Sequence, residues 1–207
     1  MTAAARERAA LVETLREVGP DAPTLCGNWT TRDLAAHLIL RERHPVASLG
    51  IMIAPLADRT ARAQQRLAER TDWEQLVEWV ADGPPLYSPF KLIDPLVNTA
   101  EMVIHHEDVR RAAPGWEPRA IDGGTLGALR RMLPFAARMS LGRGPARVTI
   151  RDADGSVVTV VGKGRDVEII GGTAELVLFL SGRDAVRLEF RASPDDVDAV
   201  RAARRKL

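Results

Sequence analysis

The sequence predicts an α+β protein, with a helical N-terminal part followed by a smaller α/β part. Apolar residues recur at helical spacing up to about residue 141, and Gly, Pro and Asn gather in the breaks. Beyond Pro145 the apolar residues alternate around Asp154-Gly155, a dipeptide typical of a tight hairpin turn. The segment "GRGP" is the clearest break between the two patterns, so we expect domains at residues 1–143 and 144–207.

The N-terminal part is predicted to be a four-helix bundle. Its longer helices are expected at residues 3–18, from 31 to near Pro45, at 94–113 and at 124–141, with shorter ones at 56–69 and 72–81. Thr30, with Asp33 three positions later, forms a variant of the capping box that begins the second helix. Four longer helices joined by short connections are typical of a bundle.

The C-terminal part is predicted to be a small α/β domain of the sandwich type. Two strands flank Asp154-Gly155, a third strand is expected in "RDVEIIGG" and a fourth in "AVRLEFRA". A short buried helix is expected in "TAELVLFLSG", and a final helix begins after Ser193.

Composition excludes several classes of partner. Lys and Arg total 29 against 28 Asp and Glu, so the charge balance gives no basis for a nucleic-acid or membrane partner. Cys26 is the single cysteine, which excludes an internal disulfide and a zinc site built of several thiolates. We therefore expect a cytoplasmic protein, either a monomer or a homodimer, that acts on small molecules.

Polar side chains recur at helical spacing on two predicted helices. Glu101, His105 and Asp108 share one helix face, whereas His106 points about 100° away. His37 lies on the apolar, inward side of the second helix. If the two helices are neighbours, two imidazoles and one carboxylate meet inside the bundle, and this is the ligand set of several catalytic zinc sites.

A structural interpretation of the same residues stays open. A histidine on an apolar helix face is often a hydrogen-bonded core residue, which would account for His37 without a metal. An inward carboxylate is costly unless it is paired or bound to a metal. Either Arg41 or Arg110 could satisfy Glu101 as an ion-pair partner.

Two segments carry a resemblance to a known family. "LCGNWTTRDLAAHL" at residues 25–38 and "AEMVIHHEDVRRA" at residues 100–112 resemble the signature segments of the mycothiol-dependent maleylpyruvate isomerase family, whose N-terminal part is a DinB-like metal-binding bundle. The C-terminal segment is similar to that family's small domain, which is related in fold to sterol carrier proteins. The resemblance implies that His37, Glu101 and His105 are the metal ligands.

The resemblance also implies a chemistry. In the family a divalent metal, usually zinc, binds the thiolate of mycothiol, and the thiol attacks a small electrophilic substrate. The resemblance thus implies a metal- and thiol-dependent isomerase or transferase with zinc and mycothiol as its cofactors. Two other functions remain open: a non-catalytic binding module braced by its metal, and a metal-dependent hydrolase. The residues that bind the thiol and the identity of the substrate are not predicted.

Three further residues have a predicted role at this site. Asp108 would accept a hydrogen bond from a ligating imidazole, or pair with Arg111 or Arg41 instead. Arg41 is expected behind the ligands, as a partner of Glu101. Arg183 is the predicted contact for an anionic substrate, although an exposed arginine that ends a helix would fit the pattern equally well.

Overall fold

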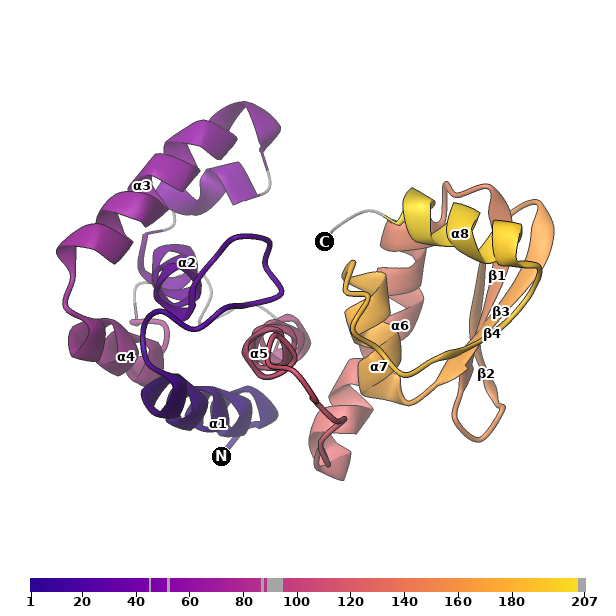
Figure 1. The fold of residues 1–207 in the computed structure, drawn as a ribbon, viewed down its shortest axis with the longest axis horizontal. Helices are drawn as coiled ribbons and strands as arrows, with labels where there is room; N and C mark the ends of the chain where they lie inside the picture. Colours follow the sequence, from indigo (N-terminus) through magenta and orange to yellow (C-terminus); the bar gives the residue numbers. More distant parts are fainter. Residues whose placement is uncertain (45, 52, 87, 89–94, 205–207) are drawn as a thin grey trace. The chain divides into compact units, whose positions relative to one another are not determined.

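The computed structural model divides the chain into two compact units, residues 1–117 and 118–207 (Figure 1). It describes residues 1–44, 46–51, 53–86, 88 and 95–204, and the side chains of residues 49, 51 and 95–97 are left aside. The predicted α+β class is confirmed, because helices are followed by a four-stranded sheet with helices of its own. No helix among these residues combines the length and apolarity needed to cross a membrane.

The first unit contains a helical bundle. Its α-helices are α1 (Ala3–Val18), α2 (Thr31–Arg43), α3 (Ala57–Arg70), α4 (Trp73–Asp82) and α5 (Pro95–Arg110), with 3₁₀ turns η1 (Ala47–Ile51) and η2 (Ala54–Leu56). The apolar core is built by α1, α2, α4 and α5, through residues such as Leu15, Leu38, Val77 and Met102. Helix α3 packs on α2 and turns a narrow buried face of small and polar residues toward it.

The boundary between the units differs from the expected one at residue 143. Helix α6 (Gly123–Leu141) packs against the sheet and the helices of the second unit, whereas the fourth bundle helix is the shorter α4. Leu129, Leu133 and Leu141 of α6 are fully buried. Periodicity shows that these residues form an amphipathic helix, but it does not show whether the apolar face packs in the core of the first or of the second unit.

The second unit is a mixed sheet of four strands in the order β2-β1-β3-β4. These are β1 (Ala146–Asp152), β2 (Val157–Gly162), β3 (Arg165–Gly171) and the short β4 (Glu189–Arg191). Strand β1 pairs antiparallel with β2 across the predicted hairpin and parallel with β3, which sets Val148 opposite Val167 and Ile150 opposite Ile169. These four residues are buried on one face, as the period of two predicts.

Helices cover the apolar face of this sheet. Helices α7 (Thr173–Leu180) and α8 (Pro194–Ala203) join α6 there, and Phe179 of α7 is among the largest fully buried side chains. Charged pairs such as Arg151 with Glu168 lie along the strands. The expected small α/β domain is therefore present, and it contains α6 in addition to the elements expected after residue 143.

Candidate metal centre

Helices α2 and α5 bring the three predicted metal ligands together. The N-terminus of α2 is fixed by the predicted capping box: the Thr30 hydroxyl accepts from the Asp33 amide, and the Asp33 carboxylate accepts from the Thr30 amide. His37 follows on the inward face of this helix. Glu101 and His105 are one turn apart on α5 and therefore share a face.

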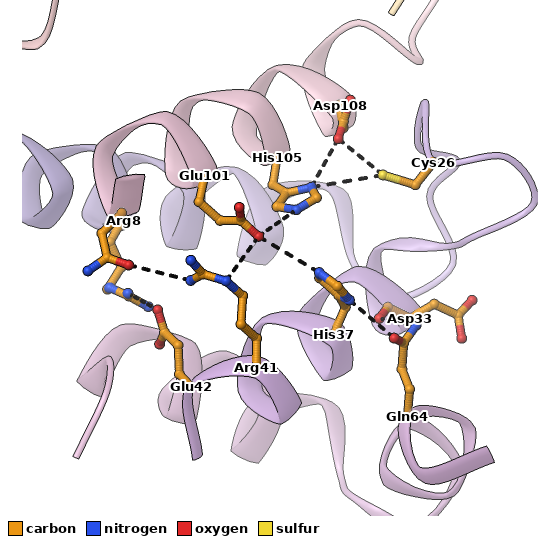
Figure 2. Close-up of polar contacts among 11 residues, drawn as sticks. Arg8, Cys26, Asp33, His37, Arg41, Glu42, Gln64, Glu101, His105 and Asp108 are labelled. Atoms are coloured by element: carbon orange, nitrogen blue, oxygen red, sulfur yellow. Dashed lines mark hydrogen bonds and ion pairs between the residues drawn. The ribbon is translucent and has the colours of Figure 1, made fainter. Parts of the chain in front are cut away.

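Glu101 lies at the centre of this group. Its Oε1 atom is 3.3 Å from His105 Nε2 and 3.8 Å from His37 Nε2, as the dashed lines in Figure 2 show. The three donor atoms lie within 4.8 Å of one another. Both imidazoles are buried, whereas 24% of the Glu101 side chain is exposed, so the group is accessible from the side of the carboxylate.

In each of the two imidazoles, the nitrogen that does not face Glu101, Nδ1, has a polar partner of its own. His105 Nδ1 lies 3.0 Å from Asp108 Oδ2, and His37 Nδ1 lies 3.3 Å from Gln64 Oε1. Histidines that bind metals generally donate their second ring N–H to a carboxylate or carbonyl in this way. Two Nε2 atoms and one carboxylate oxygen facing one point form a suitable ligand set for a divalent ion such as zinc.

Electrostatics in the metal-free chain favour a charged pair. Burial on its own lowers the pKa of His105, but hydrogen bonds with Asp108, Cys26 and Glu101 outweigh it and hold the pKa well above its usual value. Burial would raise the pKa of Glu101, but hydrogen bonds from His105 and His37 and the charge of Arg41 hold that pKa well below its usual value. In the absence of a metal, an imidazolium therefore neutralises the carboxylate.

Arg41 and Asp108 both contact a candidate ligand. Arg41 Nε lies 3.4 Å from Glu101 Oε1, so the ion pair weighed as an alternative to a metal is also present. Asp108 is fully buried and accepts from His105. His106 faces elsewhere, with Nε2 3.0 Å from the Thr14 hydroxyl on α1.

Arg183 lies in the second unit. Its guanidinium donates to the Ser181 carbonyl at 2.6 Å, just after the end of α7, and its own carbonyl accepts from Arg204. These contacts correspond to the helix-end alternative for this residue. A role in binding an anionic substrate stays a prediction.

Cys26 and Gln64 were not predicted to contribute to the site. The Cys26 thiol donates to Asp108 Oδ2 at 3.1 Å and lies 3.9 Å from His105 Nδ1, so Cys26, His105 and Asp108 form a second group with metal-binding geometry. The sequence carried no signal for Gln64, because only the structure shows that Thr60, Gln64 and Ala68, at i, i+4 spacing, form a buried face of α3.

A cavity lies beside His37, between α2 and α3. Its volume is about 710 Å³, and Trp29, Arg32, His37 and Gln64 contribute to its walls. The ring centroids of Trp29 and His37 are 5.0 Å apart. One of the three candidate ligands is therefore reached from this cavity as well as from the bundle interior.

Sequence comparison supports the resemblance in the first unit. Residues 1–83 match the model of the mycothiol maleylpyruvate isomerase N-terminal domain, and this range includes the first signature segment and His37. The second segment, with Glu101 and His105, lies beyond the matched range. No curated protein matches this sequence.

Comparison with solved structures extends the similarity to the fold of both units. The crystal structure of a mycothiol-dependent maleylpyruvate isomerase matches with a TM-score of 0.55 at 15% identity, over 90% of this chain and 88% of that chain. A histidine-to-alanine variant of that enzyme gives 0.57 at 15% identity, over 91% and 90%. Residues 1–83 thus match the model of the mycothiol maleylpyruvate isomerase N-terminal domain, and the chain shares the fold of that enzyme over about nine-tenths of its length.

Proposed function

We propose that this protein is a metal-dependent enzyme that uses a low-molecular-weight thiol of the mycothiol type to isomerise, or transfer a group on, a small electrophilic substrate. The observation that carries the proposal is the convergence of His37 Nε2, Glu101 Oε1 and His105 Nε2 within 4.8 Å. The match of residues 1–83 to an isomerase domain and the shared fold support the choice of reaction class.

Each residue of the centre would have a definite task. His37 and His105 would hold a zinc ion through Nε2, and Glu101 would supply the third ligand and a negative charge. A divalent cation held by three protein ligands keeps a position for an external ligand and binds a thiol in its deprotonated form. Asp108 would hold the His105 ring, so that its Nε2 lone pair stays directed at the centre.

The partial exposure of Glu101 is consistent with an enzyme. A metal that only braces the bundle would be expected in a closed set of four protein ligands. Around Glu101 the described residues supply two imidazoles and the guanidinium of Arg41, which cannot ligate a metal. The fourth position would therefore belong to a thiol or to water.

Metal content is the first test of the proposal. Untagged protein, analysed by mass spectrometry, should carry about one divalent ion per chain, and Glu101→Ala should carry little. Cys26→Ala is the matched control, because it removes a member of the second possible group and leaves the first intact. Loss of the metal from Cys26→Ala but not from Glu101→Ala would assign the metal to Cys26, His105 and Asp108 instead. A folded parent protein that takes up no divalent ion would remove the basis of the enzyme proposal.

Thiol binding is the second test. Cobalt-substituted protein should change its visible absorption when mycothiol is added, because a thiolate would join the coordination sphere. Turnover of maleylpyruvate, the substrate of the structurally similar enzyme, should then require both metal and mycothiol. An unchanged spectrum would favour the non-catalytic module, and turnover of an ester without any thiol would favour the hydrolase.

A further inference from the structure

The side-chain amide of Gln64 has an orientation fixed by its two partners. Gln64 is 7% exposed on α3, and its Nε2 donates to the backbone carbonyl of Asp33 at 3.4 Å. A carbonyl oxygen can only accept, so the amino group of the amide must face Asp33. Its oxygen, Oε1, is then the atom that lies 3.3 Å from His37 Nδ1.

This orientation determines which nitrogen of His37 carries the proton. Gln64 Oε1 can only accept, so the contact is a hydrogen bond when His37 Nδ1 carries hydrogen. In a neutral imidazole, the lone pair then lies on Nε2, the atom that faces Glu101. Asp108 acts in the same way on His105, so both histidines present Nε2 to the same carboxylate.

The His37 ring is restrained on two sides. Gln64 contacts its Nδ1 edge from α3, while the Trp29 ring, tilted by 43°, packs 5.0 Å from it between centroids. Neither residue belongs to the helix that carries Glu101 and His105. The direction of His37 Nε2 is therefore set by α3 and by the loop that precedes α2.

We propose that Gln64 is a positioning residue of the candidate metal centre, which holds His37 in the Nδ1–H tautomer with Nε2 directed at Glu101. The proposal deepens the proposed function, because it assigns the partner that prepares one of the ligands. It also gives helix α3, which adds little to the apolar core, a role at the centre.

Two variants on the same helix test this role. Gln64→Met keeps the length of the side chain and removes both the carbonyl acceptor and the amino donor. Gln65→Met is the matched control, because Gln65 is exposed, lines the same cavity and donates to Glu69 rather than to a histidine. Zinc affinity is measured by competition with a chromophoric chelator, and ¹⁵N NMR of the imidazoles reports the tautomer of His37 in metal-free protein.

We expect Gln64→Met to weaken zinc binding by about 10- to 100-fold, the usual effect of removing a partner of a ligating histidine. Gln65→Met should bind like the parent. In the metal-free parent, the NMR signals should show hydrogen on Nδ1 of His37, the nitrogen that faces Gln64. In Gln64→Met they should show a mixture of tautomers.

The proposal is overturned if Gln64→Met binds zinc like Gln65→Met while the His37 signals stay unchanged. Should Gln64→Met not fold, the parent decides, because an Nδ1 that carries no hydrogen is incompatible with a hydrogen bond to Gln64 Oε1. A parent that binds no zinc would overturn the metal centre, while the NMR comparison would still decide whether Gln64 holds His37. The two failures are therefore distinguishable.

Discussion

A proton and a metal ion compete for His105. The raised pKa of His105 means that its imidazole is protonated in the metal-free chain at pH values where a free histidine would be neutral. A metal can bind Nε2 only after that proton has left. Zinc affinity should therefore rise by up to about tenfold per pH unit from about pH 6.5 upward, and level off above the raised pKa.

Titrations with a competing chelator, at several pH values, measure this dependence. Asp108→Asn is the control, because the hydrogen bond that His105 donates to Asp108 is the largest of the contributions that raise the pKa of His105. In that variant the plateau should begin at a lower pH. An affinity that is constant between about pH 6.5 and pH 8 would contradict the assignment of His105 as a ligand with a raised pKa.

The same two groups should make the stability of the metal-free protein depend on pH. The raised pKa of His105 contributes stability that is complete below its usual value near 6.5 and is lost as pH rises through the raised value. The lowered pKa of Glu101 contributes stability that is complete above its usual value near 4.5 and is lost as pH falls through the lowered value. The pair therefore stabilises the fold most between these two usual values.

Urea unfolding of metal-free protein, followed by fluorescence, tests this window, since Trp29, Trp73, Trp79 and Trp116 all lie in the first unit. The contribution of the pair should disappear in the double variant Glu101→Gln, His105→Gln. An identical pH profile in parent and double variant would contradict the charged pair.

The three candidate ligands, and Asp108 and Arg41 beside them, could be proposed from the sequence, whereas Gln64 and Cys26 could not. Glu101 and His105 are i, i+4 neighbours on one helix, and His37 interrupts an apolar face, so helical geometry alone selects them. Gln64 and Cys26 reach the site from α3 and from the loop before α2. Their contribution depends on how these segments dock, and that information is not contained in local spacing.

At the scale of single elements, the last residue of β2 is a position that only glycine can occupy without strain. Gly162 has φ +75°, and a Cβ placed there would lie 2.2 Å from the Ala146 carbonyl oxygen. Gly155, in the β1–β2 hairpin turn, has φ +83° but no atom within 4 Å of such a Cβ. Both positions require left-handed backbone, but only Gly162 also lacks room.

Alanine substitution at the two positions separates backbone strain from steric overlap. Gly155→Ala should cost about 1–2 kcal/mol of unfolding free energy from the left-handed backbone alone. Gly162→Ala should cost roughly 3 kcal/mol or more, because overlap with the Ala146 carbonyl adds to the strain. Circular dichroism follows the sheet, and tryptophan fluorescence, confined to the first unit, should be unchanged. Equal costs for the two variants would show that the turn shifts to accept a Cβ.

The helices and strands themselves followed closely from sequence. Thr30 and Asp33 predicted the start of α2, and Asp154-Gly155 predicted the β1–β2 turn, because both signals act through neighbouring backbone groups. Of the expected fourth strand, only three residues near its C-terminal end became β4, Glu189–Arg191. The parallel pairing of β1 with β3 had no local signal, since a crossover brings distant segments together.

At the scale of the whole molecule, the fact that α6 belongs to the second unit determines where the chain can be cut into two fragments that fold on their own. We expect residues 1–117 to fold on their own and bind one metal ion, and residues 118–207 to fold separately. Division at 143/144 should fail, because residues 144–207 would lose the helix whose Leu129, Leu133 and Leu141 are buried in the second unit. Circular dichroism and thermal melts of the four fragments test this. A cooperative melt of residues 144–207 alone would contradict the boundary.

Two hydrogen bonds that join the loop before α2 to the end of α5 bear on the order of folding. Cys26 donates to Asp108 across 82 positions of sequence, and the Leu25 amide donates to the Asp108 carbonyl at 3.0 Å. Contacts so distant in sequence form late in folding, because closing a long loop has a large cost in conformational entropy. His37 and Glu101 are also distant in sequence and meet through a closure of the same kind, so zinc would enter a bundle that is already assembled. The rate of refolding should then be set by the chain and not by the supply of metal.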